Sequence, residues 1–382
     1  MKTKTTVLLK KVTLFFCSVC LFACACALVA CGQLEGNTGG GDNLKKLYLF
    51  DAKTDFWEGE SFSYDDLSVV GEDEDGLQDE VTDFTVDSSA YNGDKAGEYV
   101  IKVSAGGATE EYKVTVMASW KKDGELKILT IGNSFSDDAT GYLYDIATSA
   151  GIEKVKLGNL YIGGCSLETH LNNAANDSPA YEYRVCNSDT KGVWKTTTYT
   201  KMGDAIDSEN WDFITFQQAS GFSGVKNSYE PLSALEDYVR MHNETAKFGW
   251  HMTWAYQQNS DHPDFSRYGN DQITMYNAIV SAVKEKVLVE ERIKFLVPSG
   301  TAIQNARTSV YGDKFTRDGY HLTYDFGRYI AGLTLFSAIT DVSVDDVIFV
   351  APGLVKNQET VARAAAKAAL NNPLEVTSLK EN

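Results

Sequence analysis

The sequence predicts an α/β protein: a three-layer α/β/α sandwich with a mainly parallel sheet, preceded by a small N-terminal β-sandwich. In residues 119–382, short apolar runs alternate with helical patterns, which favours parallel strands covered by helices on both faces. In residues 44–118, short segments alternate apolar and polar side chains with no helical period, which is typical of a small β-sandwich. We therefore expect two folded domains.

Composition supports a folded protein and excludes one class of partner. The chain has 382 residues, of which 43% are hydrophobic and 12% aromatic, enough for a sizeable core rather than a disordered chain. Its formal net charge is -18. Because nucleic-acid phosphates attract lysine and arginine, this balance argues against a nucleic-acid partner.

Residues 1–30 have the features of a signal peptide: four lysines near the start, a long apolar stretch and small residues at the end. The final Leu-Val-Ala-Cys resembles a bacterial lipobox, in which Cys31 would become the lipidated N-terminus. The alternative is an uncleaved membrane anchor, because the apolar stretch is nearly long enough to span a bilayer. Both interpretations predict an extracytoplasmic protein attached to the membrane at the bacterial cell surface. Residues 31–43 are glycine-rich and read as a flexible tether.

The expected β-sandwich contains one clear hairpin. Residues 99–103 and 112–116 alternate apolar and polar side chains, and Gly106 and Gly107 between them suit the positive φ of a tight turn. The segment 97–103 resembles the closing strands of bacterial immunoglobulin-like modules. Such a domain would act as a spacer, or would bind glycan through Trp57 and several tyrosines.

The C-terminal domain has apolar runs that predict its strands. They lie at 126–131, 157–162, 213–216, 248–254 and 293–297, and helical patterns follow at 142–147, 232–241, 275–287, 326–336 and 362–370. In open parallel sheets, ligands bind at the carboxyl ends of the strands. The residues that follow each run are therefore the candidates for chemistry.

Ser134 directly follows the first run, in Gly132-Asn133-Ser134-Phe135. A serine on a loop between a strand and a helix is exposed, and the backbone N–H groups of the helix start face any oxyanion that forms there. The competing interpretation is a helix cap. Because Ser136, Asp137 and Asp138 are available to cap the helix, we interpret Ser134 as a nucleophile.

Asp318 and His321 lie three residues apart in the turn Asp318-Gly319-Tyr320-His321. A serine hydroxyl needs a base to take its proton, and a carboxylate fixes the tautomer of that base. This pair supplies both groups. The alternative is a turn that merely carries a surface histidine.

Polar and aromatic residues follow three other runs. Gln217, Gln218 and Ser220 come after the run 213–216, where an amide side chain would be able to donate to an oxyanion. Gly164, in a Gly-Gly pair after the run 157–162, allows the backbone to approach a substrate closely.

The end of the run 248–254 carries His251 and Trp254, and Tyr256 follows it. These residues either line a sugar-sized pocket or pack the edge of the sheet. Cys165 has no basic neighbour to lower its pKa, so we do not expect it to be a nucleophile. Cys165 and Cys186 are the two cysteines that follow Cys31, and whether they form a disulfide stays open. No Cys/His cluster predicts a metal site, and no cofactor is expected.

Together these blocks, in this order, resemble the SGNH (GDSL-like) hydrolase superfamily, and more closely one bacterial branch of it. The resemblance covers about residues 127–338. It implies a three-layer α/β/α fold and ester hydrolysis, with Ser134 as nucleophile, His321 as base and then acid, and Asp318 as the residue that orients it. It also implies an oxyanion hole made by the backbone N–H groups of Ser134 and Gly164 and one side chain.

The third oxyanion donor is where the sequence departs from the superfamily. The superfamily has an asparagine in its third block, whereas this chain offers Gln217, Gln218 and Ser220 there. Gln218 is the favoured candidate.

We therefore expect a surface-tethered serine esterase that removes small acyl groups, acetyl above all, from carbohydrate. Its partners would be an acylated carbohydrate and, through the lipid anchor, the membrane. Two other functions fit the same sequence: a non-catalytic glycan-binding lipoprotein of the same fold, and a lipid-directed esterase.

Overall fold

The computed structural model describes residues 43–117, 120 and 124–380. The proposed signal peptide, Cys31 and nearly all of the proposed tether lie outside these residues. Within the described ranges, no helix combines the length and the apolar character that a membrane crossing requires.

Residues 44–117 form two small β-sheets. The alternating segments predicted from the sequence are the central hairpin, in which Ile101, Val103, Val114 and Val116 are fully buried. Antiparallel pairing brings Ala105 opposite Ala108. The strands of the two sheets, in spatial order, are β1 (Leu44–Phe50), β3 (Ser68–Asp73) and β4 (Gln78–Val81), and β2 (Asp55–Trp57), β7 (Ala108–Met117), β6 (Gly97–Ala105) and β5 (Thr85–Asp87).

The β6–β7 turn consists of two glycines. Gly106 and Gly107 have φ of 53° and 87°. Both residues of this two-residue hairpin turn therefore need the left-handed region, which glycine adopts without steric cost.

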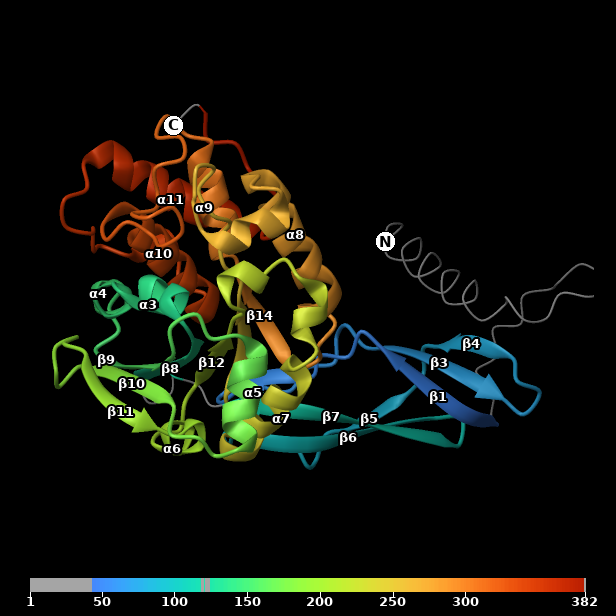
Figure 1. Cartoon of the computed structure of the whole chain (residues 1–382). Helices are drawn as coiled ribbons and strands as arrows, with labels where there is room; N and C mark the ends of the chain where they lie inside the picture. The colour runs from blue at the N-terminus through green and yellow to red at the C-terminus, as the bar shows by residue number, and fades with distance from the viewer. Residues whose placement is uncertain (1–42, 118–119, 121–123, 381–382) are drawn as a thin grey trace, which may run out of the picture. The chain divides into compact units, whose positions relative to one another are not determined.

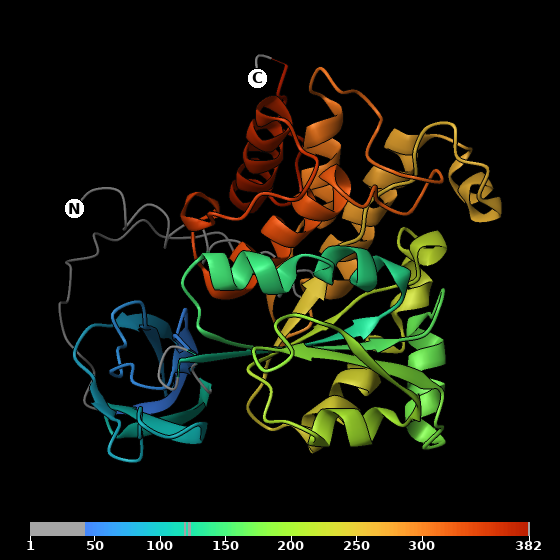
Figure 2. The ribbon, with the colours of Figure 1, turned by 90° about the vertical axis from the view of Figure 1, so that its left-hand side faces the viewer.

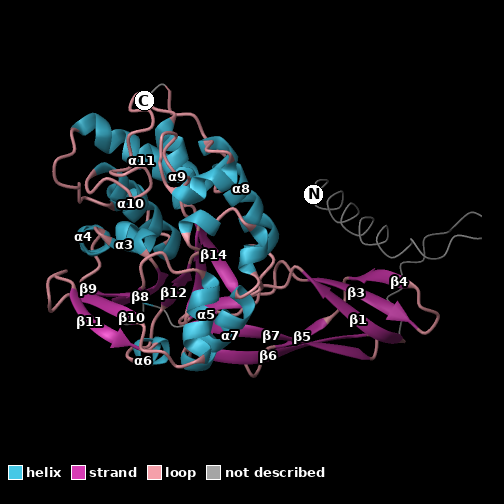
Figure 3. Cartoon of the chain, viewed as in Figure 1, coloured by secondary structure: helices cyan, strands magenta, loops and turns pink. Residues whose placement is uncertain are grey.

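The C-terminal domain is built on one seven-stranded sheet (Figure 3). Strands β9, β8, β12, β13 and β14 pair in parallel, and β10 and β11 extend one edge by antiparallel pairing. The strands, in spatial order, are β11 (Lys195–Thr200), β10 (Tyr181–Asn187), β9 (Lys154–Tyr161), β8 (Glu125–Gly132), β12 (Phe213–Phe216), β13 (Lys247–His251) and β14 (Ile293–Val297).

Helices cover both faces of this sheet (Figures 1 and 2). One face carries α3 (Ser134–Thr140), α4 (Leu143–Ser149), α9 (Ser299–Arg307), α10 (Phe326–Thr340) and α11 (Lys356–Asn371). The other carries α5 (Leu167–Ala175), α6 (Met202–Asp207) and α7 (Leu232–His242). Helix α8 (Gln272–Ala282) lies between β13 and β14 in the chain.

The predicted fold class is confirmed, and the burial of the strands explains why the sequence shows it. All four residues of β12 are buried, as is most of β8, so these central strands read as unbroken apolar runs. One boundary differs: the run predicted at 248–254 is a strand only as far as His251, and the next three residues are buried loop.

The carboxyl ends of the parallel strands are level with one another. Ile131 pairs with Leu160 and with Phe216, and Phe216 pairs with Trp250. The loops that follow β8, β9, β12 and β13 therefore leave the sheet at a common edge. That edge is where the sequence places most of the candidate site residues.

Candidate active site

Ser134 is the first residue of helix α3, two residues after strand β8 ends. The helix is capped by Asn133, whose Oδ1 accepts a hydrogen bond from the N–H of Phe135 at 3.0 Å. The caps that we expected from the sequence, Ser136, Asp137 and Asp138, do not have this role. Ser134 is nevertheless not needed as the cap, because Asn133 has that role. The N–H of Ser134, at the start of the helix, has no intrahelical acceptor.

Ser134, His321 and Asp318 form one hydrogen-bonded chain. The Oγ of Ser134 lies 2.8 Å from Nε2 of His321, and Nδ1 of His321 lies 2.6 Å from Oδ2 of Asp318. Both distances are within the range of direct hydrogen bonds. The structure thus brings together the three residues that the sequence analysis selected, in the order nucleophile, base, acid.

Asp318 is held in an acceptor role by its own turn. Its Oδ1 accepts the N–H of His321 at 2.8 Å and that of Tyr320 at 3.2 Å. Partial burial opposes ionisation of this carboxyl, but the hydrogen bonds from His321 and from the two N–H groups outweigh it, and the pKa of Asp318 lies below its usual value. An ionised Asp318 can only accept, so Nδ1 of His321 carries the proton and Nε2 is left to face Ser134.

The middle of this turn is tied to the loop after β13. The indole Nε1 of Trp254 donates to the carbonyl of Tyr320 at 2.7 Å, and the N–H of Gln257 donates to the carbonyl of Gly319 at 2.8 Å. Trp254 also packs edge-on against Phe135, with ring centroids 4.3 Å apart. Trp254 therefore contacts both the helix that carries Ser134 and the turn that carries His321.

Gly164 lies in the loop between β9 and α5, beside the start of α3. The N–H of Ile162 donates to the carbonyl of Gly132 at 3.4 Å, and Nδ2 of Asn133 donates to the carbonyl of Cys165 at 3.1 Å. Gly164 has φ of 64°, and the space where a Cβ would stand is open. This placement next to the nucleophile block is compatible with the predicted oxyanion role of Gly164, which stays a prediction.

Gln218, the favoured third oxyanion donor, is engaged elsewhere. Its Nε2 donates to the carbonyl of Ser228 at 2.8 Å and to the hydroxyl of Ser228 at 3.0 Å, while its Oε1 accepts the N–H groups of Leu167 and Ala219. A carboxamide has two N–H donors, and both are used. The structure therefore does not support this role for Gln218, whose side chain instead holds the loop after β12 against the start of α5.

The other two candidates also have partners. Nε2 of Gln217 donates to Oδ1 of Asn133 at 2.7 Å, and its Oε1 lies 3.1 Å from Nδ1 of His251. The hydroxyl of Ser220 lies 2.8 Å from that of Tyr256. Gln217 thus supports the residue that caps α3, and the identity of a third donor stays open.

His251, Trp254 and Tyr256 are buried rather than on a rim. Their exposed fractions are 2%, 0% and 0%. Nε2 of His251 lies 3.0 Å from the hydroxyl of Ser299, and burial lowers the pKa of His251 to about 4, so its ring is neutral. This burial does not support the predicted substrate-binding role, and it agrees with the other interpretation of the sequence, packing at the sheet edge.

Cys165 and Cys186 are free, buried thiols. Burial raises the pKa of each thiol to about 12. Neither is a thiolate at neutral pH, as expected from the lack of basic residues beside Cys165.

Comparison with known proteins gives the family. Residues 127–369 match the family described as domain of unknown function DUF4886. This chain belongs to the DUF4886 family. A solved DUF4886 structure from Bacteroides uniformis ATCC 8492 is 42% identical in sequence, with a TM-score of 0.65, and the similarity covers 67% of this chain and 99% of that one. Residues 50–116 match the bacterial Ig-like domain (group 3), as the N-terminal resemblance implied.

Two further similarities are weaker. A protein from Slackia heliotrinireducens that has been proposed to be an SGNH hydrolase is 18% identical, with a TM-score of 0.36, over 56% of this chain and 99% of that one. Pectate lyase L from Thermoclostridium stercorarium is 37% identical over 86 residues, or 22% of this chain. The matched segment of this chain spans only 7% of the length of that lyase.

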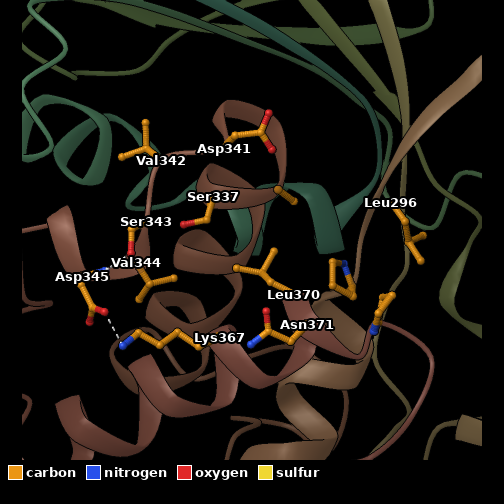
Figure 4. Close-up of a pocket in the computed structure, with 13 residues that line it drawn as sticks. Leu296, Ser337, Asp341, Val342, Ser343, Val344, Asp345, Lys367, Leu370 and Asn371 are labelled. Carbon is orange, nitrogen blue, oxygen red and sulfur yellow. Dashed lines mark hydrogen bonds and ion pairs between the residues drawn. The ribbon is translucent and has the colours of Figure 1, made fainter. Parts of the chain in front are cut away.

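A hollow of about 640 Å³ lies at the ends of α10 and α11, where they meet the end of β14 (Figure 4). Leu296, Ser337 and Leu370 are among its lining residues, and Lys367 and Asp345 form an ion pair at 2.5 Å beside it. None of the site residues predicted from the sequence lines this hollow. The hollow is therefore separate from the cluster of Ser134, His321 and Asp318.

Two neighbours of Ser134, Asn133 and Asp138, make contacts in the structure that the sequence does not reveal. Asn133 is buried and connects β8, the glycine loop and Gln217, although in the sequence it only spaces Gly132 from Ser134. Asp138, which we read as a possible cap, is fully buried and faces the turn of His321. Its position four residues after Ser134, one helical turn along the same face, is the signal that would have drawn attention to it.

Proposed function

We propose that this DUF4886 protein is a serine esterase that removes small acyl groups, acetyl above all, from carbohydrate. The observation that carries the proposal is the continuous chain Ser134–His321–Asp318, with separations of 2.8 and 2.6 Å. Three groups in this order activate a hydroxyl for attack on a carbonyl carbon.

The first half of the reaction would acylate the serine. Oγ of Ser134 attacks the ester carbonyl carbon while Nε2 of His321 takes the hydroxyl proton. The negative oxygen that forms faces the N–H groups at the start of α3 and, in our proposal, that of Gly164. When the tetrahedral intermediate collapses, the C–O bond to the sugar breaks, and His321 gives the proton to the departing sugar oxygen, which leaves as a hydroxyl.

The second half would regenerate the enzyme. His321 takes a proton from a water molecule, and the water oxygen attacks the acyl carbon. Collapse breaks the bond to Oγ and returns the proton to Ser134, which releases the carboxylic acid. Throughout, ionised Asp318 stabilises the imidazolium form of His321 and keeps its ring oriented.

Carbohydrate as the substrate rests on the sequence rather than on the site. The lipobox-like segment suits a protein at the cell surface, where acylated polysaccharides are available as substrates. One fold hosts many substrates, so the class of ester has to be measured.

The decisive test is a pair of assays on the wild type and on Ser134→Ala. We expect the wild type to react covalently with a fluorophosphonate probe at Ser134 and to release acetate from one or more members of a panel of acetylated polysaccharides. Ser134→Ala should lose probe labelling, and its turnover should fall by about 10⁴-fold or more, since the nucleophile is gone while the fold is kept.

The outcomes separate the competing functions. A folded wild-type protein that binds glycan but is neither labelled nor active would be a glycan-binding lipoprotein, and the proposal would be wrong. Hydrolysis of phospholipid or long-chain acyl esters without acetate release would indicate a lipid-directed esterase. Full activity of Ser134→Ala would refute the mechanism itself.

A further inference from the structure

Asp138 of helix α3 has a fully buried carboxylate, which binds both residues that flank the turn bearing Asp318 and His321. Its Oδ2 accepts the N–H of Leu322, the residue directly after His321, at 2.8 Å. Nη1 of Arg317, the residue directly before Asp318, lies 2.9 and 3.1 Å from its two oxygens. One carboxylate thus binds both flanks of the turn.

The turn is also closed on itself at these flanks. The N–H of Arg317 donates to the carbonyl of His321 at 2.8 Å, and Nη1 of Arg317 donates to the carbonyl of Leu322. Thr316 and Leu322 form a short antiparallel bridge. Because the flanks are joined to each other, a group that fixes them fixes the turn as a rigid piece.

A second guanidinium completes the charge balance. Nε and Nη2 of Arg328, on α10, each lie 2.8 Å from Oδ1 of Asp138. The carboxylate thereby has two arginines and one backbone N–H around it, which compensates for its complete removal from water. Arg317 and Arg328 remain partly exposed, and both stack on the ring of Tyr324.

We propose that Asp138 is a positioning residue, which holds Nε2 of His321 at hydrogen-bonding distance from Ser134. Asp138 follows Ser134 by four residues, so both side chains leave the same face of one rigid helix. The nucleophile and the anchor of its base therefore move together. This inference rests on the proposed esterase function, because it assigns a role within that reaction.

Asp137 provides the matched contrast. It lies on the same turn of α3, but it is more exposed and pairs at 2.5 Å with Arg184 of β10. Its contact with Arg328 is longer, at 3.9 Å. Among the described residues, Asp137 makes no hydrogen bond or ion pair with the turn that carries Asp318 and His321, so replacing it tests the loss of a carboxylate on α3 by itself.

The experiment compares Asp138→Asn with Asp137→Asn in the full chain, using a small acetyl ester. For Asp138→Asn we expect kcat to fall about 100-fold, with KM changed less than about threefold, because a displacement of the base by about 1 Å costs that much in rate without altering ground-state binding. Asp137→Asn should keep both constants within about threefold. Circular dichroism verifies that both variants fold.

Crystal structures of the two variants supply a readout that needs no activity. We expect the separation between Nε2 of His321 and Oγ of Ser134 to exceed about 3.5 Å, beyond a hydrogen bond, in Asp138→Asn and to stay near the wild-type distance in Asp137→Asn. If the wild type hydrolyses no ester and Ser134 takes no probe, the esterase proposal fails. This separation still decides whether Asp138 positions His321.

Folded Asp138→Asn with wild-type kcat and an unchanged separation would overturn the inference. Should that variant not fold, Arg328→Gln tests the same idea, since it removes one partner of Asp138 and leaves the carboxylate paired with Arg317 and Leu322. We expect a loss of about tenfold in kcat, and unchanged kcat in Arg328→Gln would overturn the proposal.

Discussion

Asp318 and Glu236 are two carboxyl groups whose surroundings push their pKa values in opposite directions. Asp318 accepts three hydrogen bonds, and its pKa is lowered despite partial burial. Its contribution to stability is therefore present above the usual pKa of an aspartate, about 3.9, and is lost as the pH falls through its lower folded pKa. The orienting carboxylate stays charged throughout the neutral range.

Glu236 shows the reverse case and leads to a prediction on stability. This α7 residue is 1% exposed, and neither of its carboxylate oxygens has a hydrogen-bond partner among the described residues. Burial raises its pKa to about 8, with Glu290 and Asp237 adding repulsion that Arg292 and Arg240 only partly offset. Between about pH 4.3 and 8 the unfolded chain loses this proton while the native chain keeps it, so stability falls as the pH rises.

Replacing Glu236 by Gln should remove that pH dependence. We expect the loss in free energy of unfolding between pH 5 and pH 7.5 to shrink by roughly 3 kcal/mol, as measured by urea denaturation at both pH values. The exposed Glu244, two residues after the end of the same helix, gives the control variant Glu244→Gln, which should follow the wild type. Identical pH dependence in Glu236→Gln and the wild type would contradict this account.

At single residues, the sequence predicted the grouping of Ser134 with Asp318 and His321 but not the surroundings of that group. These three residues can be recognised from local sequence alone: Ser134 follows an apolar run, and an acid and a base lie three residues apart. The roles of Gln218 and Trp254 depend on their hydrogen-bond partners in the folded protein, which the sequence does not show. Trp254 follows a strand, as a rim residue would, yet the loop continues inward and its indole donates a hydrogen bond to the turn that carries Asp318 and His321.

The junction of β8 with α3 depends on a glycine. A Cβ on Gly132 would lie 2.7 Å from Cδ of Gln217 and 2.8 Å from Oγ of Ser136, closer than side chains pack. We expect Gly132→Ala to lower the free energy of unfolding by about 1 to 3 kcal/mol, because these buried side chains have to shift. Urea denaturation measures the difference.

Gly163→Ala is the matched control for this junction. The nearest atom to its added Cβ is the hydroxyl of Tyr161 at 3.5 Å, an ordinary contact. The free energy of unfolding of Gly163→Ala should stay within about 0.5 kcal/mol of the wild-type value. Equal effects of the two substitutions would show that steric crowding at Gly132 is not what matters.

Among the elements, the buried parallel strands were predictable and the antiparallel extension was not. Strand β12 consists of four buried residues and reads as an apolar run whatever its neighbours. Strand β11, of sequence Lys-Thr-Thr-Thr-Tyr-Thr, is almost entirely exposed. It is a strand because it pairs with the preceding strand β10, and this pairing leaves no apolar alternation in a segment whose side chains are polar and exposed.

At the scale of the whole molecule, the proposal of a surface lipoprotein rests on Cys31. If the lipobox interpretation is correct, Cys31→Ser expressed in a bacterial host should no longer incorporate labelled fatty acid, because the thiol that receives the lipid is gone. Cys26→Ser, also within the first 31 residues, should be labelled like the wild type. Unchanged labelling of Cys31→Ser would contradict the proposed anchor.

The hydrogen bond between Ser134 and His321 spans 187 positions of the chain. A ribosome makes the serine long before the turn that activates it, and an interrupted chain that lacks the final third carries a hydroxyl with no base. Loop closure over such a distance is slow compared with the folding of local elements. We therefore expect the proposed esterase activity to appear late in synthesis and folding, and a chain truncated before His321 to be inactive.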